Sequence, residues 1–356
     1  MKRYSKNTLP RVLFAGPDLR SRGGIASVMG LYKKALGEIS YLPTTHFRNK
    51  AFSVVAFAMA LIKLPFYRLK GYDTLHAHGS VRGSWPRKSL LLDWARFLGM
   101  RTVHHIHNGA LQKHFAAIGP DKVARSLRKR DAVVALTQGW ADYLRREFGL
   151  TNVVVIENPV EFTEATRKEN SSGVLRLLFL STIDHTKGLD ELLAAIARHK
   201  DELHGRVHLD VGGDGSGYRD ALDFIARHGI ENIVSTHGWM SGEPKARLIE
   251  SNDVFVLPSY AEGQPMSLLE AMAAGLAAIV TPVGGMAEVI DDGVNGIFVT
   301  PKDSESIFEA IKFFIAHPDA IPEMGKKNRV IAAKFLPERV AEKVIALHKS
   351  LQEKKK

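Results

Sequence analysis

Short apolar runs recur along the chain, and stretches with apolar residues at every third or fourth position separate them. Such runs predict buried parallel strands, and the stretches between them predict helices. Alternation of the two is typical of a doubly wound α/β sheet. The clearest predicted strands form two series, at 11–15, 73–79, 101–109, 131–136 and 152–156, and at 174–180, 207–211, 233–236, 254–257 and 277–280.

A chain of 356 residues exceeds what one hydrophobic core usually serves, so two domains are expected. The polar segment 161–173 has no clear period and predicts the linker between them. Residues 1–160 would form the N-terminal domain and residues 174–335 the C-terminal domain. Residues 336–356, with Pro337 at the start, predict a terminal helix.

The loop between the strand at 254–257 and the helix at 267–274 carries the most informative residues. Such a loop lies at the carboxyl edge of a sheet, where open α/β folds bind ligands. Glu262 lies in this loop and Glu270 about one turn into the helix, whose free N–H groups suit a phosphate. A nucleotide sugar would offer hydroxyl groups on either side of a diphosphate. Ser267 and Glu270 also have the spacing of a capping box, so both interpretations stay open.

The string from Glu262 to Glu270 resembles the E-x7-E signature of family-four retaining glycosyltransferases of the GT-B fold. This resemblance implies two facing Rossmann-like domains, an interdomain cleft, and a C-terminal helix that crosses back to the first domain. It also implies that Glu262 contacts the donor sugar and Glu270 the ribose. Backbone N–H groups near Ser267 and Leu268 would hold the phosphates. The donor site would further include Gln264, Pro265 and Met266.

Other segments of the C-terminal half match the same family. Its members usually read Gly-Arg-x4-Lys-Gly after the first strand, and Lys187 keeps the lysine that would neutralise the diphosphate. Thr182 stands at the arginine position, which removes a bidentate guanidinium. The resemblance also places two further turns near the donor, with Gly213 in the first and Gly238, Trp239 and Met240 in the second.

In the N-terminal half, Gly23 and Gly24 open a helix after the first strand. Their spacing fits neither the dinucleotide fingerprint nor the P-loop. The resemblance places this glycine pair against the donor diphosphate, and His107 at the active-site rim, where the family's histidine meets the donor sugar or the acceptor. Asn108 replaces the usual glycine or aspartate beside it.

Arg87 and Lys88 lie at the start of a predicted helix. The segment 83–88 resembles a subset of these enzymes that build cell-surface polysaccharide. Two cations at a helix start cost dipole energy unless an anion joins them, and a lipid-linked diphosphate acceptor would fit. Solvent exposure explains the cations almost as well. Together with Asn108, these residues are the expected acceptor site.

The charge is uneven along the chain. Residues 1–165 hold 26 Lys+Arg and 11 Asp+Glu, a net +15, whereas residues 166–356 hold 23 and 27, a net −4. A basic half favours an anionic partner. A predicted helix at 51–69, apolar at helical spacing and flanked by Lys and Arg, fits either a bilayer interface or a protein core. Aromatic residues make up 8% of the chain and form no stacking array among cations, so we expect contact with an anionic membrane and no nucleic acid.

Metal, membrane span and secretion are not expected. The longest uncharged run, 271–287, is interrupted by glycine and proline and predicts no spanning helix. The chain has no cysteine, and residues 1–11 lack the apolar core of a secretory signal, so a cytoplasmic location at the inner face of the cell membrane is expected. Alternation along two strands explains His76, His78, His105 and His107 without a metal.

We therefore expect retaining, metal-independent transfer of a hexose from a UDP-, GDP- or ADP-sugar to a hydroxyl group of a saccharide or lipid-linked acceptor. Glu262, Lys187 and His107 would act at the reacting centre. No cofactor is expected. The alternatives are another GT-B activity, such as a nucleotide-sugar epimerase, or a nonenzymatic basic protein that binds nucleic acid or membrane.

Overall fold

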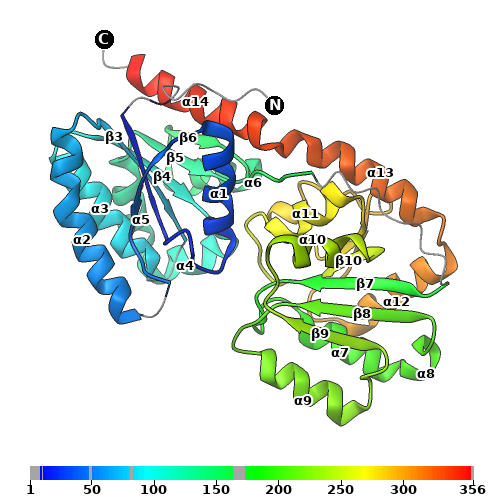
Figure 1. Cartoon of the computed structure of the whole chain (residues 1–356). Helices are drawn as coiled ribbons and strands as arrows, with labels where there is room; N and C mark the ends of the chain where they lie inside the picture. The colour runs from blue at the N-terminus through cyan, green and yellow to red at the C-terminus, as the bar shows by residue number, and fades with distance from the viewer. Residues whose placement is uncertain (1–8, 10, 48–49, 81–82, 163–172, 354–356) are drawn as a thin grey trace. The chain divides into compact units, whose positions relative to one another are not determined.

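The computed structural model describes residues 9, 11–47, 50–80, 83–162 and 173–353 (Figure 1). The chain divides into two compact units, unit 1 with Met1–Pro159 and Phe335–Lys356, and unit 2 with Val160–Lys334. Most of the predicted linker at 161–173 lies outside the described residues. The predicted return of the terminal helix to the N-terminal half agrees with this division.

Unit 1 is built on six parallel strands in the order β2-β1-β3-β4-β5-β6. Their bounds are β1 (Val12–Gly16), β2 (Ser40–Pro43), β3 (Thr74–Gly79), β4 (Arg101–Ile106), β5 (Ala132–Ala135) and β6 (Val153–Val155). The edge strand β2 was not predicted. Leu42 is its only buried residue, so the strand lacks the apolar run of a central strand.

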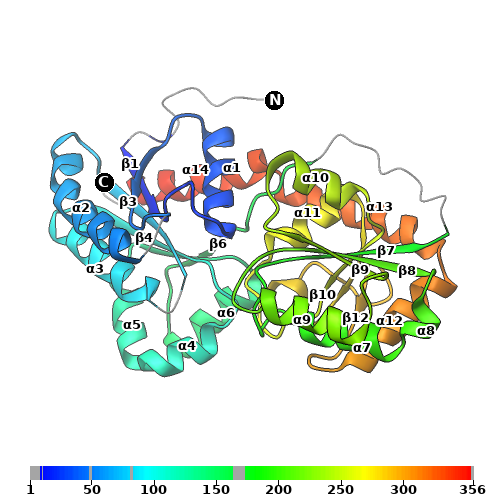
Figure 2. The ribbon, with the colours of Figure 1, turned by 60° about the horizontal axis from the view of Figure 1, so that its bottom comes forward.

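The helices of unit 1 cover both faces of its sheet (Figures 1 and 2). They are α1 (Gly24–Leu36), α2 (Lys50–Leu69), α3 (Ser84–Phe97), α4 (Leu111–Ile118), α5 (Pro120–Arg128), α6 (Gln138–Phe148) and α14 (Pro337–Glu353). On one face α2 and α3 pack on apolar side chains of β1 and β3, such as Leu13 and Leu75. On the other, α1 supplies Tyr32 and α14 supplies His348 to rings from β1 and β3. The terminal helix therefore covers part of one face of the first sheet.

Unit 2 repeats the architecture with the strand order β12-β11-β10-β7-β8-β9. Its strands are β7 (Leu175–Leu180), β8 (Val207–Gly212), β9 (Val234–Gly238), β10 (Val254–Leu257), β11 (Ala277–Val280) and β12 (Ile297–Phe298). Its helices are α7 (Leu189–Arg198), α8 (Lys200–Leu203), α9 (Tyr218–His228), α10 (Gly242–Glu250), α11 (Met266–Ala274), α12 (Ser304–Ala316) and α13 (Ala320–Ala332), and the 3-10 turns are η1 (Gly284–Met286) and η2 (Ala333–Phe335). The predicted doubly wound α/β class is confirmed.

The strand order of each unit reverses at one point. In unit 2 the chain runs outward from β7 through β8 to β9 and then returns to place β10 on the other side of β7. In unit 1 the same reversal separates β1 from β3. Helices that follow strands on opposite sides of such a point cover opposite faces, which leaves a crevice at the carboxyl ends of the two strands. The loops after β7 and β10 are therefore where unit 2 is expected to bind a ligand.

Helix α2 is the one helix in the described ranges that is long and apolar enough to cross a membrane by length and composition. Sequence analysis predicted this helix but not that it is long and apolar enough to span, because Lys63 interrupts its uncharged run. Ala60 and Leu64, 1% and 0% exposed, pack one side of the helix into the core of unit 1. Only 17% of its most apolar window is buried, however, so the interpretation of 51–69 as a core helix is wrong for most of its surface.

Candidate active site

The loops after β7 and β10 touch each other at the carboxyl edge of unit 2. The backbone N–H of Tyr260 donates to the carbonyl of Thr186 at 2.9 Å. Gly188 has φ +74°, and a Cβ atom there would lie 2.2 Å from the carbonyl oxygen of Pro258. Any side chain at this position would force the two loops apart. Glycine therefore lets Lys187 lie against the loop that carries Glu262.

Lys187 and Glu262 form an ion pair at this contact. The Lys187 Nζ atom lies 2.6 Å from the Glu262 Oε1 atom, which also accepts a hydrogen bond of 2.8 Å from the Ser259 hydroxyl. The two side chains are 19% and 9% exposed, so the pair is largely desolvated. A buried carboxylate with two donors is held in one orientation. The structure thus brings together two of the three residues predicted for the reacting centre.

The loop after β11 holds Glu262 from the other side. Gly284 has φ +53°, and a Cβ atom there would lie 1.8 Å from the Glu262 carbonyl oxygen. Gly285 N–H donates to the Gly263 carbonyl at 2.7 Å, and the Thr281 hydroxyl donates to the Ser259 carbonyl. The orientation of Glu262 therefore depends on backbone contacts from a neighbouring strand end.

Helix α11 begins directly after the loop that follows β10, and its start is not a capping box. Pro265 is the N-cap residue and no side chain caps the helix, while Glu270 accepts a 2.7 Å hydrogen bond from Lys245 of α10. The capping-box interpretation is therefore wrong. Ser267 and Leu268 lie in the first turn, where backbone N–H groups have no partner within the helix. Such a turn, with no acidic residue in it, suits an anion.

Lys245 was missed by sequence reasoning. Lys245 forms an ion pair with Glu270, and the two side chains are 25% and 20% exposed. No motif or periodicity distinguishes Lys245 from the other lysines of the chain. Its contact with Glu270 arises only from the packing of α10 against α11, which the sequence does not show.

The remaining donor residues lie on adjacent strand ends. Gly213 has φ +155°, and a Cβ atom there would lie 2.0 Å from the Ser181 carbonyl oxygen. Gly213 N–H donates to the Gly238 carbonyl at 2.7 Å, which joins the ends of β8 and β9. The predicted positions range from exposed through half-buried to buried, namely Thr182 exposed, Gly238, Trp239, Met240, Pro265 and Met266 half-buried, and Gln264 buried.

Unit 1 carries its predicted site residues at the equivalent edge. His107 follows β4, its N–H donates to the Gly79 carbonyl at 2.8 Å, and its Nε2 atom lies 2.9 Å from Nδ1 of His78. Asn108 is used locally, since its Oδ1 atom accepts from Ala110 N–H at 2.6 Å and its amide donates to Ser80 at 3.2 Å. Asn108 is therefore a turn residue as well as a candidate contact.

The glycine pair lies where the sequence places it. Gly23, at φ +134°, is the N-cap residue of α1, and Gly24 is its first residue. No side chain caps this helix and its first turn has no acidic residue. The start of α1 follows the end of β1, beside the reversal of strand order in unit 1.

Lys88 is buried, 3% exposed, in the first turns of α3. Its ammonium donates to the Thr44 hydroxyl, which in turn donates to the Gly16 carbonyl at 2.8 Å. Burial, and to a smaller extent repulsion from Arg87, lowers the pKa of Lys88 to about 7. Within the described ranges no carboxylate contacts Arg87 or Lys88. Solvent exposure therefore does not explain Lys88, whereas an anion would supply the missing countercharge.

The histidines of β3 and β4 form a stack on the sheet face beneath α1 and α14. Ring centroids are 4.6 Å apart for His76 and His78, 4.6 Å for His78 and His105, and 4.3 Å for His105 and His107. His348 of α14 adds a fifth ring, with its Nε2 atom 3.0 Å from Nδ1 of His76. Sequence reasoning predicted the alternation and missed His348, which lies 272 residues away.

Three rings of this stack have nitrogen atoms close enough to one another to hold a metal ion. One nitrogen from each of His76, His78 and His105 lies within 4.8 Å of the others. The rings are stacked with planes 16° to 34° apart, so their lone pairs run side by side and do not converge on one point. Burial lowers the pKa of all three well below the usual range. The geometry favours neutral, stacked imidazoles over a metal centre.

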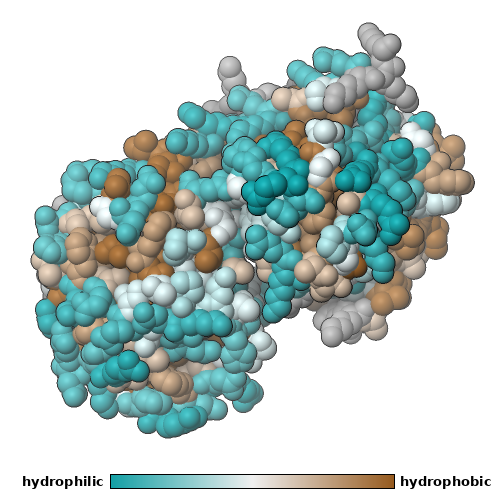
Figure 3. All heavy atoms as spheres, turned by 180° about the vertical axis from the view of Figure 1, so that it is seen from behind, coloured by the Kyte–Doolittle hydropathy of each residue, from teal (hydrophilic) through white to brown (hydrophobic). Residues whose placement is uncertain are grey.

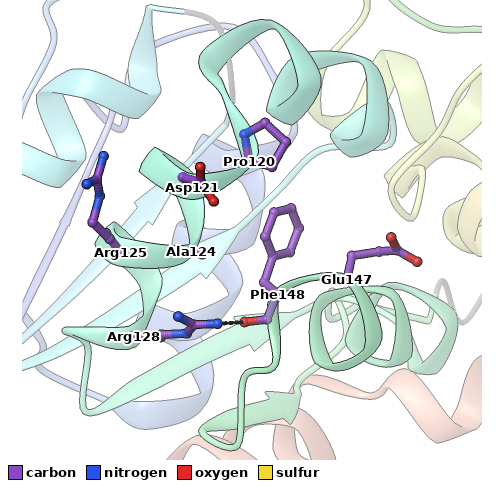
Figure 4. A pocket seen from close by; sticks show the side chains of 7 residues that line it. All are labelled: Pro120, Asp121, Ala124, Arg125, Arg128, Glu147 and Phe148. Carbon is purple, nitrogen blue, oxygen red and sulfur yellow. Dashed lines mark hydrogen bonds between the residues drawn. The ribbon is translucent and has the colours of Figure 1, made fainter.

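A hollow of about 300 Å³ lies elsewhere in unit 1, between α5 and α6 (Figure 4). Figure 4 shows Arg128 donating to the Phe148 carbonyl across its floor, at 2.8 Å. Pro120, Asp121 and Glu147 complete the rim. None of the residues predicted for donor or acceptor lines this hollow, and we give it no role in the reaction.

In a comparison with known proteins, both halves of the chain match glycosyltransferase families. Residues 161–331 match the family described as glycosyl transferases group 1, and residues 30–164 match glycosyltransferase family 4. The chain is 31% identical over 308 residues to a D-inositol 3-phosphate glycosyltransferase of Streptomyces griseus, covering 74% of this chain and 64% of that protein. It is 24% identical over 273 residues to the glycogen synthase of Mycobacterium tuberculosis, covering 72% and 63%. The chain thus spans somewhat less than two thirds of the length of these relatives.

Among solved structures, Anabaena HepE in complex with UDP aligns with a TM-score of 0.77 at 19% identity, over 96% of this chain and 100% of that one. At this identity the likeness concerns the fold, which is the two-domain Rossmann-like architecture of the GT-B class.

Proposed function

Because this chain belongs to the family-four glycosyltransferases of the GT-B fold, we propose that it transfers a hexose from a nucleotide diphosphate sugar to an acceptor hydroxyl group. The proposal includes retention of configuration at the sugar and no requirement for a metal. The observation that carries it is the Lys187–Glu262 pair. The pair joins the loops after the neighbouring strands β7 and β10, where the strand order reverses, and Glu262 lies shortly before the start of α11.

The first task of such a site is to stabilise the leaving diphosphate. Negative charge grows on the diphosphate as the bond to the sugar breaks, and preorganised donors aimed at that charge supply the largest part of the catalysis. Lys187 and the N–H groups of Ser267 and Leu268 are the donors that unit 2 offers near Glu262.

The second task is to orient the sugar and the nucleoside. Glu262 has one oxygen held by Lys187 and Ser259, so its other oxygen is the acceptor for sugar hydroxyl groups. Glu270 would accept from the ribose, with Lys245 holding its carboxylate in place. Backbone groups at Gly238, Trp239 and Met240 would receive the base. Since Anabaena HepE is described in complex with UDP, we propose a UDP-sugar as the first donor to test, before GDP- and ADP-sugars.

Unit 1 would bind the acceptor. Neither the buried amine of Lys88 nor its neighbour Arg87 has a carboxylate partner among the described residues. A phosphate beside them would hold Lys88 in its charged form, which favours an acceptor that carries phosphate. A saccharide linked to a lipid through a diphosphate has this chemistry, so we propose such an acceptor, used at the cytoplasmic face of a membrane. His107, fixed by His78 and Gly79, would line the side of the sugar.

Thermal unfolding with nucleotide sugars tests the donor assignment. A ligand at about 100 times its Kd adds about 2.7 kcal/mol to the free energy of unfolding, which raises the Tm of a domain of this size by several degrees. We expect this rise with UDP-glucose or with its GDP or ADP counterpart, and none with free glucose. The absence of any shift with all three would contradict the proposal. Release of a free rearranged sugar without acceptor would identify an epimerase instead.

Replacement of Lys88 by methionine tests the acceptor assignment. The variant keeps the length of the side chain and removes the charge, so folding is preserved or improved, while a charge-assisted bond to phosphate is lost. We expect the KM for a lipid-diphosphate-linked saccharide to rise about 10- to 100-fold with the KM for the donor unchanged. The same saccharide without the diphosphate should be used equally well by both proteins. An unchanged KM for the phosphorylated acceptor would remove Lys88 from the site.

A further inference from the structure

Helix α2 is apolar on two opposite sides. Its inner side packs into the core of unit 1 through Phe57, Ala60, Leu61, Leu64 and Tyr67. A second set of apolar residues recurs at steps of three and four positions on the other side, each between 43% and 84% exposed, and we call this set the outer stripe: Phe52, Val55, Met59, Ile62, Phe66 and Leu69. The helix therefore buries one apolar stripe and presents another.

A surface helix of a globular protein normally has polar residues opposite its buried side. From Phe52 to Leu69 the outer stripe extends about 26 Å, at 1.5 Å per residue. Figure 3 shows hydrophobic atoms along the edge of unit 1 where α2 runs, at the right of that view. Phe97 of α3, 79% exposed, stacks on Trp94, and the Trp94 indole donates to the Leu61 carbonyl of α2. Exposed apolar surface of this extent marks an interaction site.

The charges beside the outer stripe indicate what covers it. Helix α2 contains no aspartate or glutamate. Lys63 and Lys70 are both exposed, and each follows a member of the stripe, Met59 and Phe66, by four positions. The two cations therefore border the same edge of the stripe. A second copy of the chain would bring further cations and no acids from this helix, whereas an anionic bilayer offers apolar chains beneath a negative surface.

The inner side of α2 decides how the helix meets the bilayer. Ala60 and Leu64 are 1% and 0% exposed, so a helix that crossed the membrane alone would uncover the core of unit 1. The helix can instead lie in the plane of the interface with its outer stripe inserted, which is the usual arrangement of an amphipathic helix at a membrane.

Topology places this helix next to the proposed acceptor site. All strands of unit 1 are parallel, so α2 and α3 both begin at the carboxyl edge of the sheet, where Arg87 and Lys88 lie. A lipid whose phosphate reaches these residues would have its chains in the bilayer that α2 contacts.

We propose that the outer stripe of α2 inserts into the surface of an anionic membrane, with Lys63 and Lys70 at the phosphate groups. This inference deepens the proposed function, on which its link to a lipid-linked acceptor rests. The contact holds the enzyme at the surface where such an acceptor is embedded.

Vesicle flotation tests the surface directly, without any catalytic step. The probes are vesicles of phosphatidylcholine with about one third phosphatidylglycerol, and vesicles of phosphatidylcholine alone. We expect the full chain to bind the anionic vesicles, and Ile62→Glu/Phe66→Glu to lose this binding. Lys63→Glu/Lys70→Glu should weaken it at least about 25-fold, since each of the two cations near an anionic surface contributes about fivefold in affinity. Val330→Glu, at a 70% exposed valine of unit 2, is the matched control and should bind like the parent.

Three results would overturn the inference. One is no binding of the parent protein to anionic vesicles. Another is equal binding by Ile62→Glu/Phe66→Glu. The third is a dimer in light scattering that Ile62→Glu/Phe66→Glu dissociates while no vesicle binding occurs, which would show that a second copy covers the stripe. The Tm shift with nucleotide sugars, measured on the same variants without vesicles, reports on the proposed function separately.

Discussion

Replacement of Lys187 by alanine is expected to reduce kcat for hexose transfer by about 100- to 1,000-fold, the usual cost of one preorganised donor to a developing negative charge. The ammonium lies 2.6 Å from Glu262 and is the one side-chain cation that contacts this carboxylate in the described part of the chain. In the proposed site its loss would remove a donor to the leaving diphosphate, and it would free Glu262 to rotate. Initial rates at saturating donor and acceptor measure the effect.

The fold of this variant should survive, because Ser259 still donates to Glu262 and the glycine contacts of the loop remain. Circular dichroism and the Tm of the variant check this. Lys326→Ala is a matched control, since Lys326 pairs with Glu323 on an exposed surface of the same unit. It should keep full activity. Parent-like kcat in Lys187→Ala would refute the assignment of the site, and a comparable loss in Glu262→Ala would support it.

Lowering the pH from 7.5 to 5.5 is expected to destabilise unit 1 strongly. His76, His78 and His105 are buried with the pKa held well below the usual value, and burial lowers the pKa of His348 to about 4 and that of His104 to about 3. Unfolding exposes each ring to water, where its pKa returns to about 6.5. Below that pH the unfolded chain therefore binds protons that the folded chain excludes, and stability falls as pH falls.

The expected size of this effect follows from the pKa difference. One unit below pH 6.5, each excluded proton costs about 1.4 kcal/mol, so five histidines cost about 7 kcal/mol. The entire free energy of unfolding of a typical domain is about 5 to 15 kcal/mol. Urea denaturation at pH steps between 7.5 and 5.5 measures the loss. His348→Leu should lower the slope of the free energy of unfolding against pH by about one proton, because this ring is one of those that the folded chain keeps neutral. A free energy of unfolding that stays constant over this range would contradict the neutral stack.

The central strands and the donor loops were predictable because each depends on neighbours in sequence, whereas the edge strands β2 and β12 lack a long apolar run and were missed. The run at 254–257, its proline stop and the glycine after α11 are local signals, and β10 and α11 begin and end within one residue of the expected positions. The E-x7-E spacing located Glu262 in the same way. The predicted roles of these residues stay predictions until they are tested.

What the sequence did not reveal arises from packing between distant segments. Lys245 reaches Glu270 from another helix, and His348 reaches His76 across almost the whole chain. The capping-box spacing of Ser267 and Glu270 was misleading because Pro265 is the N-cap residue, so Ser267 lies inside the first turn of the helix. For α2, periodicity located the helix but could not say which apolar side is buried, since both sides have helical spacing.

The position of α14 has a consequence for synthesis of the protein. The first sheet receives one of its covering helices from the last residues of the chain, with Val340, Val344 and His348 buried against it. While the ribosome is still translating unit 2, this face of the sheet, with its row of imidazoles, is exposed to water or bound by a chaperone. Domains usually fold in the order in which they emerge. Here the first sheet is fully covered only after α14 has been synthesised, so a product truncated before Pro337 would leave this face of the core exposed.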